Sequence, residues 1–337
     1  MHFYGEFNVD LYVTDCRISN ISNGFFSSII VFFYNKVTFE NIHYDNATNN
    51  GKPLFYFLYN IENITVKNVT ISNFSGTVSD SNDIFAYSSF PTTINVVEQL
   101  HVVDTDLNGK SVIACSNPID QIQIFDSVFE NITISSSDYI IDIGQIKSII
   151  LNTTTFSNIK TSDDVNTNGA VLFFETLDLN SDLDTSIQDI TLDDCGIPFF
   201  VLSSAINQSP VNKRFELSNI NFTNTHFESN RALFSTDSIE LDTTFQISMT
   251  NLLFSNISFS NTGTLIECRQ QLPTYMTITG SQFIDLNAAT IRIASSNADN
   301  TNPTIFVQIY DTVFSNINDQ YNSLINVNEG GWLEINY

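Results

Sequence analysis

Short apolar runs alternate with polar positions along the whole chain, and two landmarks recur in a fixed order. The first landmark is the pattern Phe-x-Asn-Ile, and the second is an apolar run that follows it after a variable polar stretch. Both landmarks are short and carry apolar residues at alternate positions, a period that indicates β-strands rather than helices. Complete copies of the first pattern begin at Phe39, Phe129, Phe156, Phe254 and Phe314.

The spacing of these landmarks predicts a repeat protein. Degenerate copies of the pattern fill the intervals, at Ile18, Ile71, residues 103–107, residues 192–195, Phe222 and Phe283. The mean interval is about 30 residues, a period typical of repeat architectures. Two or three short strands cannot bury an apolar face alone, whereas stacked repeats bury a continuous core.

Among repeat architectures, a parallel β-helix fits both the period and the strand length. Leucine-rich repeats need a Leu-x-x-Leu-x-Leu frame, which is absent, and propeller blades need four strands in about 40 to 50 residues. We therefore predict an all-β, right-handed parallel β-helix of about ten to eleven coils, each of roughly 30 residues. Phe and Ile would point inward, and Asn would take the left-handed backbone conformation at a tight corner and stack on its neighbours.

The coil pattern resembles that of the pectin-lyase-like right-handed parallel β-helix superfamily. The Phe-x-Asn-Ile repeats are similar to those of polymorphic outer-membrane adhesins and large protist surface proteins, and the resemblance spans nearly the whole chain. The Gly-Gly-Ala-Ile partner motif of those adhesins is absent, and an apolar run occupies its place. The resemblance implies an extracellular or cell-surface protein.

We expect one β-helix segment over residues 1–337, as a piece of a longer chain. No apolar stretch is long enough to span a membrane, and the N-terminus lacks the pattern of a signal peptide. Polar excursions that break the period are predicted to be lateral loops, at residues 44–52, 160–169, 178–188, 207–214 and 296–303.

Charge narrows the choice of partners. The chain has 12 Lys and Arg against 37 Asp and Glu, a net charge of −25. Such a surface repels nucleic acid and anionic membranes, so we predict neither as a partner. It also repels polygalacturonate, the acidic substrate that many enzymes of the resembling superfamily cut.

One segment suggests catalysis, because glycoside hydrolysis needs two carboxylates beside the scissile bond. Asp193-Asp194-Cys195-Gly196 resembles the Asp-Asp-Cys segment of polygalacturonases. The Asn-Thr-Asp, Gly-His-Gly and Arg-Ile-Lys motifs of that family are absent: Thr225 and Phe227 flank His226, and Ala294 follows Arg292-Ile293. The favoured interpretation is a degenerate corner with Asp in place of Asn, so no catalytic residue is predicted.

Metal and cofactor sites are not predicted either. An acidic stretch carries Asp178, Asp182, Asp184 and Asp189, but its spacing matches no calcium-binding repeat. The four histidines do not pair with cysteine at the spacing of metal ligands: His2, His43, His101 and His226.

Ten Asn-x-Ser/Thr sequons suggest N-glycosylation. The favoured candidates lie in predicted loops or at outward strand positions: Asn46, Asn63, Asn68, Asn207 and Asn221. The others rank behind them, chiefly because an inward-facing corner ladder would hide most of their side chains: Asn20, Asn73, Asn131, Asn152 and Asn256.

The four cysteines are expected to be small apolar core residues. Cys16, Cys115, Cys195 and Cys268 fall on coils separated by two or more steps of about 4.8 Å, too far apart for a disulfide.

The leading functional hypothesis is an extracellular structural or adhesive shaft, without enzymatic activity, that self-associates end to end or continues into further coils of the same chain. The alternative is a polysaccharide lyase or glycoside hydrolase. A third hypothesis is a glycan-binding module with exposed aromatics such as Tyr56 or Tyr59 as platforms.

Overall fold

The computed structural model is an all-β parallel solenoid, and every pair of strands in it runs parallel. It describes residues 8–20, 26–27, 33–46, 48–49, 53–58, 61–76, 83–88, 94–107, 111–115, 119–135, 138–144, 146–162, 169–176, 183–204, 211–227, 232–238, 243–259, 264–270, 274–287, 289–295, 305–318, 324–327 and 331–336. Within these residues no helix is long and apolar enough to cross a membrane.

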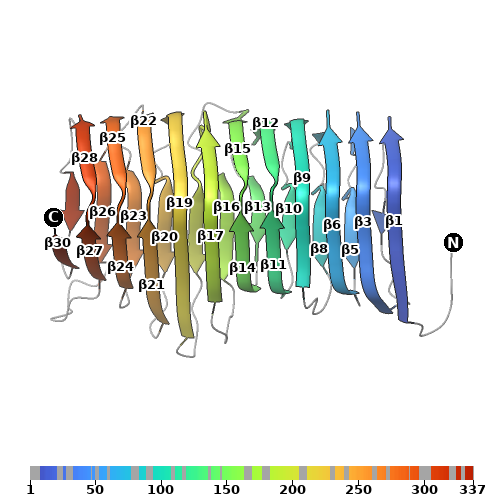
Figure 1. Cartoon of the computed structure of the whole chain (residues 1–337), viewed down its shortest axis with the longest axis horizontal. Coiled ribbons are helices and arrows are strands. Elements are labelled where there is room, and N and C mark those ends of the chain that lie inside the picture. The colour runs from blue at the N-terminus through green and yellow to red at the C-terminus, as the bar shows by residue number, and fades with distance from the viewer. Residues whose placement is uncertain are drawn as a thin grey trace.

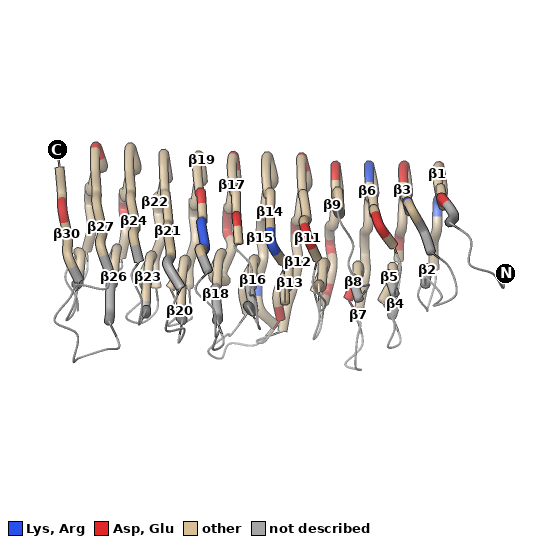
Figure 2. Tube along the Cα trace, turned by 90° about the horizontal axis from the view of Figure 1, so that it is seen from below, with Lys and Arg blue, Asp and Glu red and all other residues tan. Residues whose placement is uncertain are grey.

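The strands form two sheets that face each other across the core (Figure 1, Figure 2). The first sheet contains β1 (Asn8–Ser19), β3 (Phe33–Asp45), β4 (Thr48–Asn49), β6 (Ile61–Ser72), β7 (Ser75–Gly76), β9 (Ile94–Asp106), β11 (Ile119–Phe125), β12 (Val128–Ile134), β14 (Ile146–Asn152), β15 (Thr155–Thr161), β17 (Leu183–Asp193), β19 (Val211–Phe227), β21 (Thr243–Thr250), β22 (Leu253–Phe259), β24 (Thr274–Thr279), β25 (Gln282–Asn287), β27 (Ile305–Tyr310), β28 (Val313–Ile317) and β30 (Gly331–Asn336). Within the described residues its strands lie in coil order from β1 to β30 (Figure 1).

The second sheet has eleven strands within the described ranges, one from each successive coil. They are β2 (Phe26–Ser27), β5 (Phe55–Leu58), β8 (Phe85–Ser88), β10 (Ile113–Cys115), β13 (Tyr139–Ile143), β16 (Ala170–Thr176), β18 (Phe200–Ser204), β20 (Phe234–Ser238), β23 (Thr264–Gln270), β26 (Ala289–Ser295) and β29 (Ile325–Val327). Because each strand pairs with its counterpart one coil away, the register of one coil fixes that of the next.

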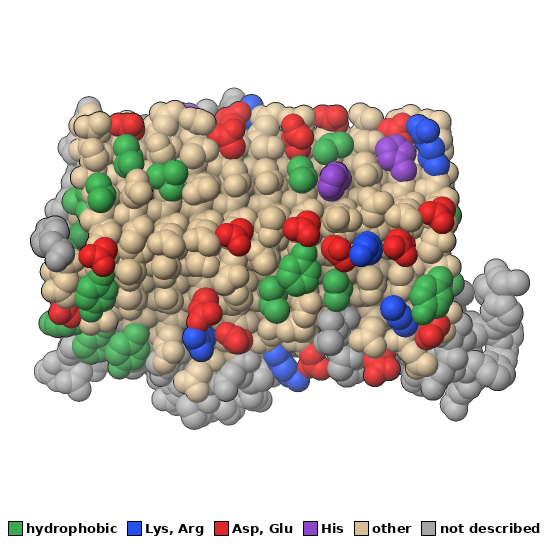
Figure 3. Space-filling model, viewed as in Figure 1, with side chains coloured by type: hydrophobic (Ala, Val, Ile, Leu, Met, Phe, Trp, Pro, Cys, Tyr) green, Lys and Arg blue, Asp and Glu red, His purple; other side chains and the backbone are tan. Residues whose placement is uncertain are grey.

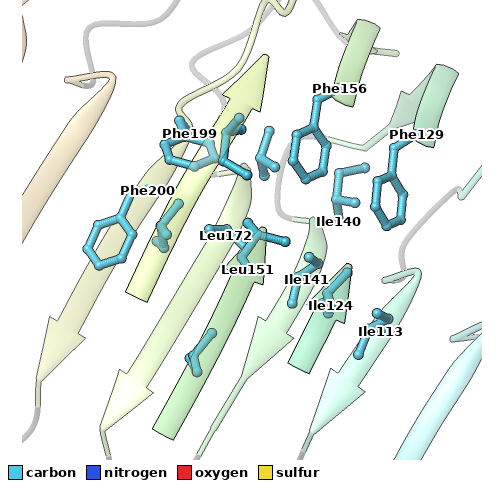
Figure 4. Close-up of a cluster of buried hydrophobic side chains, with 14 of the residues drawn as sticks. Ile113, Ile124, Phe129, Ile140, Ile141, Leu151, Phe156, Leu172, Phe199 and Phe200 are labelled. Carbon is cyan, nitrogen blue, oxygen red and sulfur yellow. The ribbon is translucent and has the colours of Figure 1, made fainter. Parts of the chain in front are cut away.

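Alternating inward residues of both sheets form one continuous core. Phe129 and Phe156 stack in register with ring centroids 4.9 Å apart, and Phe199 meets Phe156 edge to face (Figure 4). Similar stacks run toward the C-terminal coils, for example Phe222 on Phe254 at 4.7 Å. Parallel, in-register pairing places a residue next to one of the same type on the neighbouring coil. Each column of Phe residues therefore stabilises the fold both by burying apolar surface and by aromatic stacking.

The first sheet bends twice in each coil, and a residue with positive φ stands at each bend. Within the described residues these positions form two columns of eleven. The first-corner column contains Asp15, Asn41, Asn68, Gln99, Asp126, Thr153, Asp189, Asn219, Asn251, Gly280 and Asp311. The second-corner column contains Asn20, Asn46, Asn73, Asp104, Asn131, Asn158, Asp194, Asn224, Asn256, Asp285 and Asn316.

The corners confirm the left-handed Asn and correct two details of the prediction. Each coil has two corners five residues apart, whereas the sequence pattern predicted one. The motif at Phe39 lies at the first corner, because Asn41 bonds to Asp15, whereas the motif at Phe129 lies at the second. Both corners need the same local order, an inward apolar residue, an outward residue, a left-handed residue and another inward apolar residue, so one motif serves either.

Four predicted lateral loops were drawn too wide. Residues 44–45 belong to β3 and 48–49 to β4, residues 160–161 end β15, residues 183–188 begin β17, and residues 211–214 begin β19. The apolar period was obscured there because Thr185 and Lys213 occupy inward positions and are fully buried. The remaining parts of the predicted loops at 47, 50–52, 163–168, 178–182, 207–210 and 296–303 lie outside the described residues.

Candidate functional site

Asparagine side chains at the corners form hydrogen-bonded ladders along the outside of the solenoid. At the first corner the Nδ2 of Asn68 donates to Asn41 Oδ1 at 2.8 Å, and Asn41 Nδ2 donates to Asp15 Oδ1 at 2.9 Å. At the second corner Asn158 Nδ2 donates to Asn131 Oδ1 at 2.6 Å, and Asn131 Nδ2 to Asp104 Oδ1 at 3.0 Å. Each bond therefore joins one coil to the preceding coil.

The ladders have a direction, because the described corner amides donate toward the N-terminal coil. Asn219 donates to Asp189 and Asn251 to Asn219 in the first column, and Asn316 donates to Asp285 in the second. A carboxylate can accept but cannot donate, so an Asp at a corner breaks the ladder on its N-terminal side. Runs of donating amides begin at four corner aspartates, Asp15, Asp104, Asp189 and Asp285.

Two aspartates beside the second corner are held by the same pair of donors. Asp45 Oδ1 accepts from Ser72 Oγ at 3.0 Å and from Asn73 Nδ2 at 2.9 Å. Asp193 Oδ1 accepts from Thr223 Oγ1 and Asn224 Nδ2, both at 2.8 Å. The hydrogen bonds from Asn73 and then Ser72 lower the pKa of Asp45 below its ordinary value.

The Asp193-Asp194-Cys195-Gly196 segment has the geometry of a corner. Asp194 takes the left-handed conformation with φ 51°, and its carboxylate lies 3.4 Å from the exposed Lys160 ammonium. Asp193 is occupied by its two donors, and Cys195 is buried with its thiol toward the Phe156 carbonyl oxygen. These contacts match the interpretation of the segment as a corner with Asp in place of Asn.

Asp194 leaves the ladder incomplete. Asn158 Oδ1 is buried and has no hydrogen-bond donor, because the corner one coil further on is a carboxylate. An amide at position 194 would present an Nδ2 to this oxygen, as Asn158 does to Asn131.

We therefore expect Asp194→Asn to stabilise the fold. One hydrogen bond to a buried acceptor is gained and one exposed ion pair with Lys160 is lost, for a net increase of about 0.5–1 kcal/mol in the free energy of unfolding. Urea denaturation measures the change, and Asp184→Asn, an exposed strand position, controls for the loss of one negative charge. An equal increase in the free energy of unfolding in both variants would mean that the loss of a negative charge, and not a new hydrogen bond to Asn158, is responsible.

A shallow pocket of about 310 Å³ opens at the second corner where β6, β9 and β12 adjoin. Its lining residues are Asn73, Phe74, Ser75, Asp104, Thr105, Asp106, Asn131 and Thr133. Asp104 accepts from Asn131 but cannot donate to Asn73, so the ladder is interrupted at this place. The pocket is polar, but the structure supplies no basic side chain among its lining residues.

The acidic and histidine residues considered as possible metal ligands are placed on separate parts of the fold. Among the described residues there is no group of three or more His, Cys, Asp or Glu that could hold a metal ion. Asp184 lies in β17 and Asp189 at the first corner, while Asp178 and Asp182 lie outside the described residues. His226 Nδ1 lies 2.8 Å from Ser258 Oγ on the next coil.

The sequon asparagines are placed differently from the prediction. The corner ladder faces outward, so Asn20, Asn73, Asn131 and Asn256 are exposed rather than hidden. Asn46 and Asn68 are themselves corner residues, so the predicted distinction between corner and lateral sequons was wrong. The reason is that flanking apolar residues fill the interior, which leaves the corner side chain in solvent.

The other sequons lie on strands or beyond the described part. Asn221 is exposed on β19, Asn152 is half-buried at the end of β14, and Asn63 is half-buried with its Nδ2 3.4 Å from the Asn35 carbonyl oxygen. Asn207 lies outside the described residues. Which sequons carry sugar stays a prediction.

The cysteines are free thiols on separate coils, and three of them are core residues. Cys115, Cys195 and Cys268 are buried, and Cys16 is half-buried near the N-terminal end of the described chain. Burial raises the pKa of the Cys195 and Cys268 thiols to about 12 and raises that of Cys115 as well.

These thiols are expected to be unreactive in the native state. At neutral pH only a minute fraction of Cys195 or Cys268 is thiolate, and the thiolate is the species that alkylates. Iodoacetamide followed by peptide mass spectrometry should label Cys16 first and the three buried cysteines only after denaturation. Rapid native labelling of Cys115, Cys195 and Cys268 would contradict their placement in the core.

The structure describes one of the two tyrosines that were predicted as aromatic platforms. Tyr56 is half-buried on β5, and Tyr59 lies outside the described residues. The exposed aromatic row instead lies on the first sheet: Tyr275 and Trp332 are 47% and 45% exposed, with Phe306 between them in register. The alternation of inward and outward positions along a strand could have predicted that each ring points outward. It could not have predicted that the three rings lie beside one another.

The fold and its corners define a parallel β-solenoid with outward amide ladders. No family model matches the chain, and no curated protein sequence matches it significantly. The tailspike gp61 of Pseudomonas phage phi297 is similar in structure at 12% sequence identity and a TM-score of 0.28, over 83% of this chain and 48% of the tailspike chain. This chain thus spans about half the length of that tailspike, and so distant a likeness carries no functional argument. The resemblance to the pectin-lyase-like superfamily stays a prediction.

Proposed function

We propose that this chain is an extracellular β-helical shaft with a structural role at a surface. The observation that carries the proposal is that polar side chains at the corners form hydrogen bonds between coils. Corner asparagines and aspartates join most neighbouring coils by side-chain hydrogen bonds, at positions such as Asn131, Asp193 and Asn219. Acidic residues are spread along the coils rather than gathered at one place (Figure 2).

The two ends of the stack support an end-to-end extension of the shaft. Among the described residues β1 pairs only with β3, and β30 with β27 in the first sheet. The inward side chains of Leu11, Val13 and Leu333 pack on the core but are only partly buried. Further coils of the same chain, or another copy, would pair these strand edges and cover this apolar surface.

Sedimentation velocity of residues 1–337 over a hundredfold range of concentration tests the extension. We expect the sedimentation coefficient to rise with concentration, and Val13→Lys to suppress the rise by placing a charge in the end surface. Tyr12→Lys is the matched control, because Tyr12 points outward and is 58% exposed. A wild-type chain that stays monomeric throughout would remove self-association from the proposal.

An activity assay distinguishes the enzymatic alternative from the shaft proposal. A polysaccharide lyase or hydrolase would release unsaturated or reducing ends from its substrate, and Asp193→Asn or Asp194→Asn would abolish that release if the carboxylates acted as the catalytic pair. Under the shaft proposal no release is expected. Release of sugar ends by the unmodified chain that is lost in these variants would overturn the shaft proposal.

A further inference from the structure

Three aromatic side chains form a row on the outward face of the first sheet. Tyr275, Phe306 and Trp332 occupy the same position on the consecutive strands β24, β27 and β30. The Tyr275 and Phe306 rings are parallel within 5° with centroids 5.1 Å apart, whereas the Trp332 ring is turned by 59° from Phe306. Trp332 therefore does not continue the stack, and its ring face is not covered by Phe306.

Polar groups fixed by hydrogen bonds lie beside this row. Gln308 Nε2 donates to Glu334 Oε2 and Asn336 Nδ2 donates to Glu334 Oε1, both at 3.0 Å. These donors, Asn336 first, lower the pKa of Glu334 below its ordinary value, so the carboxylate is ionised. Hydrophobic side chains gather over β24, β27 and β30 at the C-terminal end of this face (Figure 3).

The size and charge of the surface select the kind of partner. The surface consists of three partly exposed rings, flanked in register by Thr277, Gln308 and Glu334, whereas a stable protein interface covers roughly 800 Å² per partner, about 20–30 residues. Rings that give apolar area beside a few fixed hydrogen-bonding groups are typical of small-ligand recognition. The net charge of −25 and the ionised Glu334 disfavour an acidic ligand.

We infer that the Tyr275–Phe306–Trp332 row is a binding site for a neutral polysaccharide. The C–H face of a sugar ring packs against the exposed Trp332 ring and along Tyr275, and its hydroxyl groups donate to Glu334 and accept from the amide of Gln308 or Asn336. This site goes beyond the proposed shaft, because it would give the shaft a lateral attachment to a neutral carbohydrate.

Trp332 is the only tryptophan of the chain, so its fluorescence reports on the site directly. Hydroxyethylcellulose and α-mannan, both neutral, and polygalacturonate, which is acidic, are titrated into the chain at a concentration where it is monomeric. We expect a blue shift of Trp332 emission with at least one neutral polysaccharide and none with polygalacturonate. Tyr275→Ala should weaken the binding by about tenfold or more.

Tyr12→Ala is the matched control, because Tyr12 is an exposed tyrosine of the same sheet at the other end of the described chain. It should bind as the unmodified chain does. The inference is overturned if neither neutral polysaccharide moves the emission, if Tyr275→Ala binds unchanged, or if polygalacturonate binds best. It is also overturned if dilution alone shifts Trp332 emission, since another copy would then cover the row. The first three outcomes do not bear on the shaft. A shift of Trp332 emission on dilution would instead agree with end-to-end association, because Trp332 lies on β30, the last strand of the first sheet.

Discussion

Replacing Phe156 with Ala is expected to lower the free energy of unfolding by about 3–5 kcal/mol. Phe156 is fully buried, stacks on Phe129 at 4.9 Å and meets Phe199 edge to face at 6.4 Å. The truncation removes apolar burial and leaves a cavity that the backbone cannot close, because hydrogen bonds to β12 on one side and β17 on the other fix the position of β15.

Urea denaturation followed by circular dichroism measures the loss. Phe156→Leu keeps most of the volume and should cost clearly less, and Tyr12→Ala, at a 58% exposed site, should change stability by no more than about 0.5 kcal/mol. A Phe156→Ala cost near that of Tyr12→Ala would show that Phe156 is not part of a packed column.

Replacing Asn131 with Ala is expected to lower the free energy of unfolding by about 3–4 kcal/mol, a large loss for an exposed residue. Two ladder hydrogen bonds disappear, one to Asp104 and one from Asn158, at about 1 kcal/mol each. Alanine must also hold φ near 53°, a left-handed conformation that costs about 1–2 kcal/mol more.

A series at this position separates the two causes. Asn131→Gly keeps the left-handed backbone and loses only the ladder bonds, so it should lie between the wild type and Asn131→Ala. Asn221→Ala, at an exposed sequon asparagine outside the corner columns, should be nearly neutral. The chains are produced in bacteria so that no N-glycan contributes. Equal and small effects of all three would contradict a structural role for the ladder.

The repeat itself could be predicted because inward positions tolerate only a few residue types. One inward column contains Phe129, Phe156 and Phe254 and keeps phenylalanine beside a left-handed Asn in most of its coils, which leaves a visible motif. The first corner was detected only at Phe39 and was not recognised as a second column, because its residues vary among Asn, Asp, Gln99, Thr153 and Gly280. The bend requires a left-handed φ at this position but no particular side chain.

The outward direction of the ladder and the aromatic row could not be predicted from periodicity. Left-handed φ at Asn131 does not say whether its amide faces the core or solvent, which depends on how Phe129 and Ile132 fill the interior. The row of Tyr275, Phe306 and Trp332 depends on the register across coils, and the lengths of the variable stretches between strands set that register.

Immunogold electron microscopy of intact, unpermeabilised producing cells or particles tests the proposed shaft most directly. Antibodies against residues 1–337 should label projections on the outer surface, with label on rods rather than on the surface layer beneath them. Label that appears only after permeabilisation, or that is diffuse in the interior, would contradict an extracellular shaft.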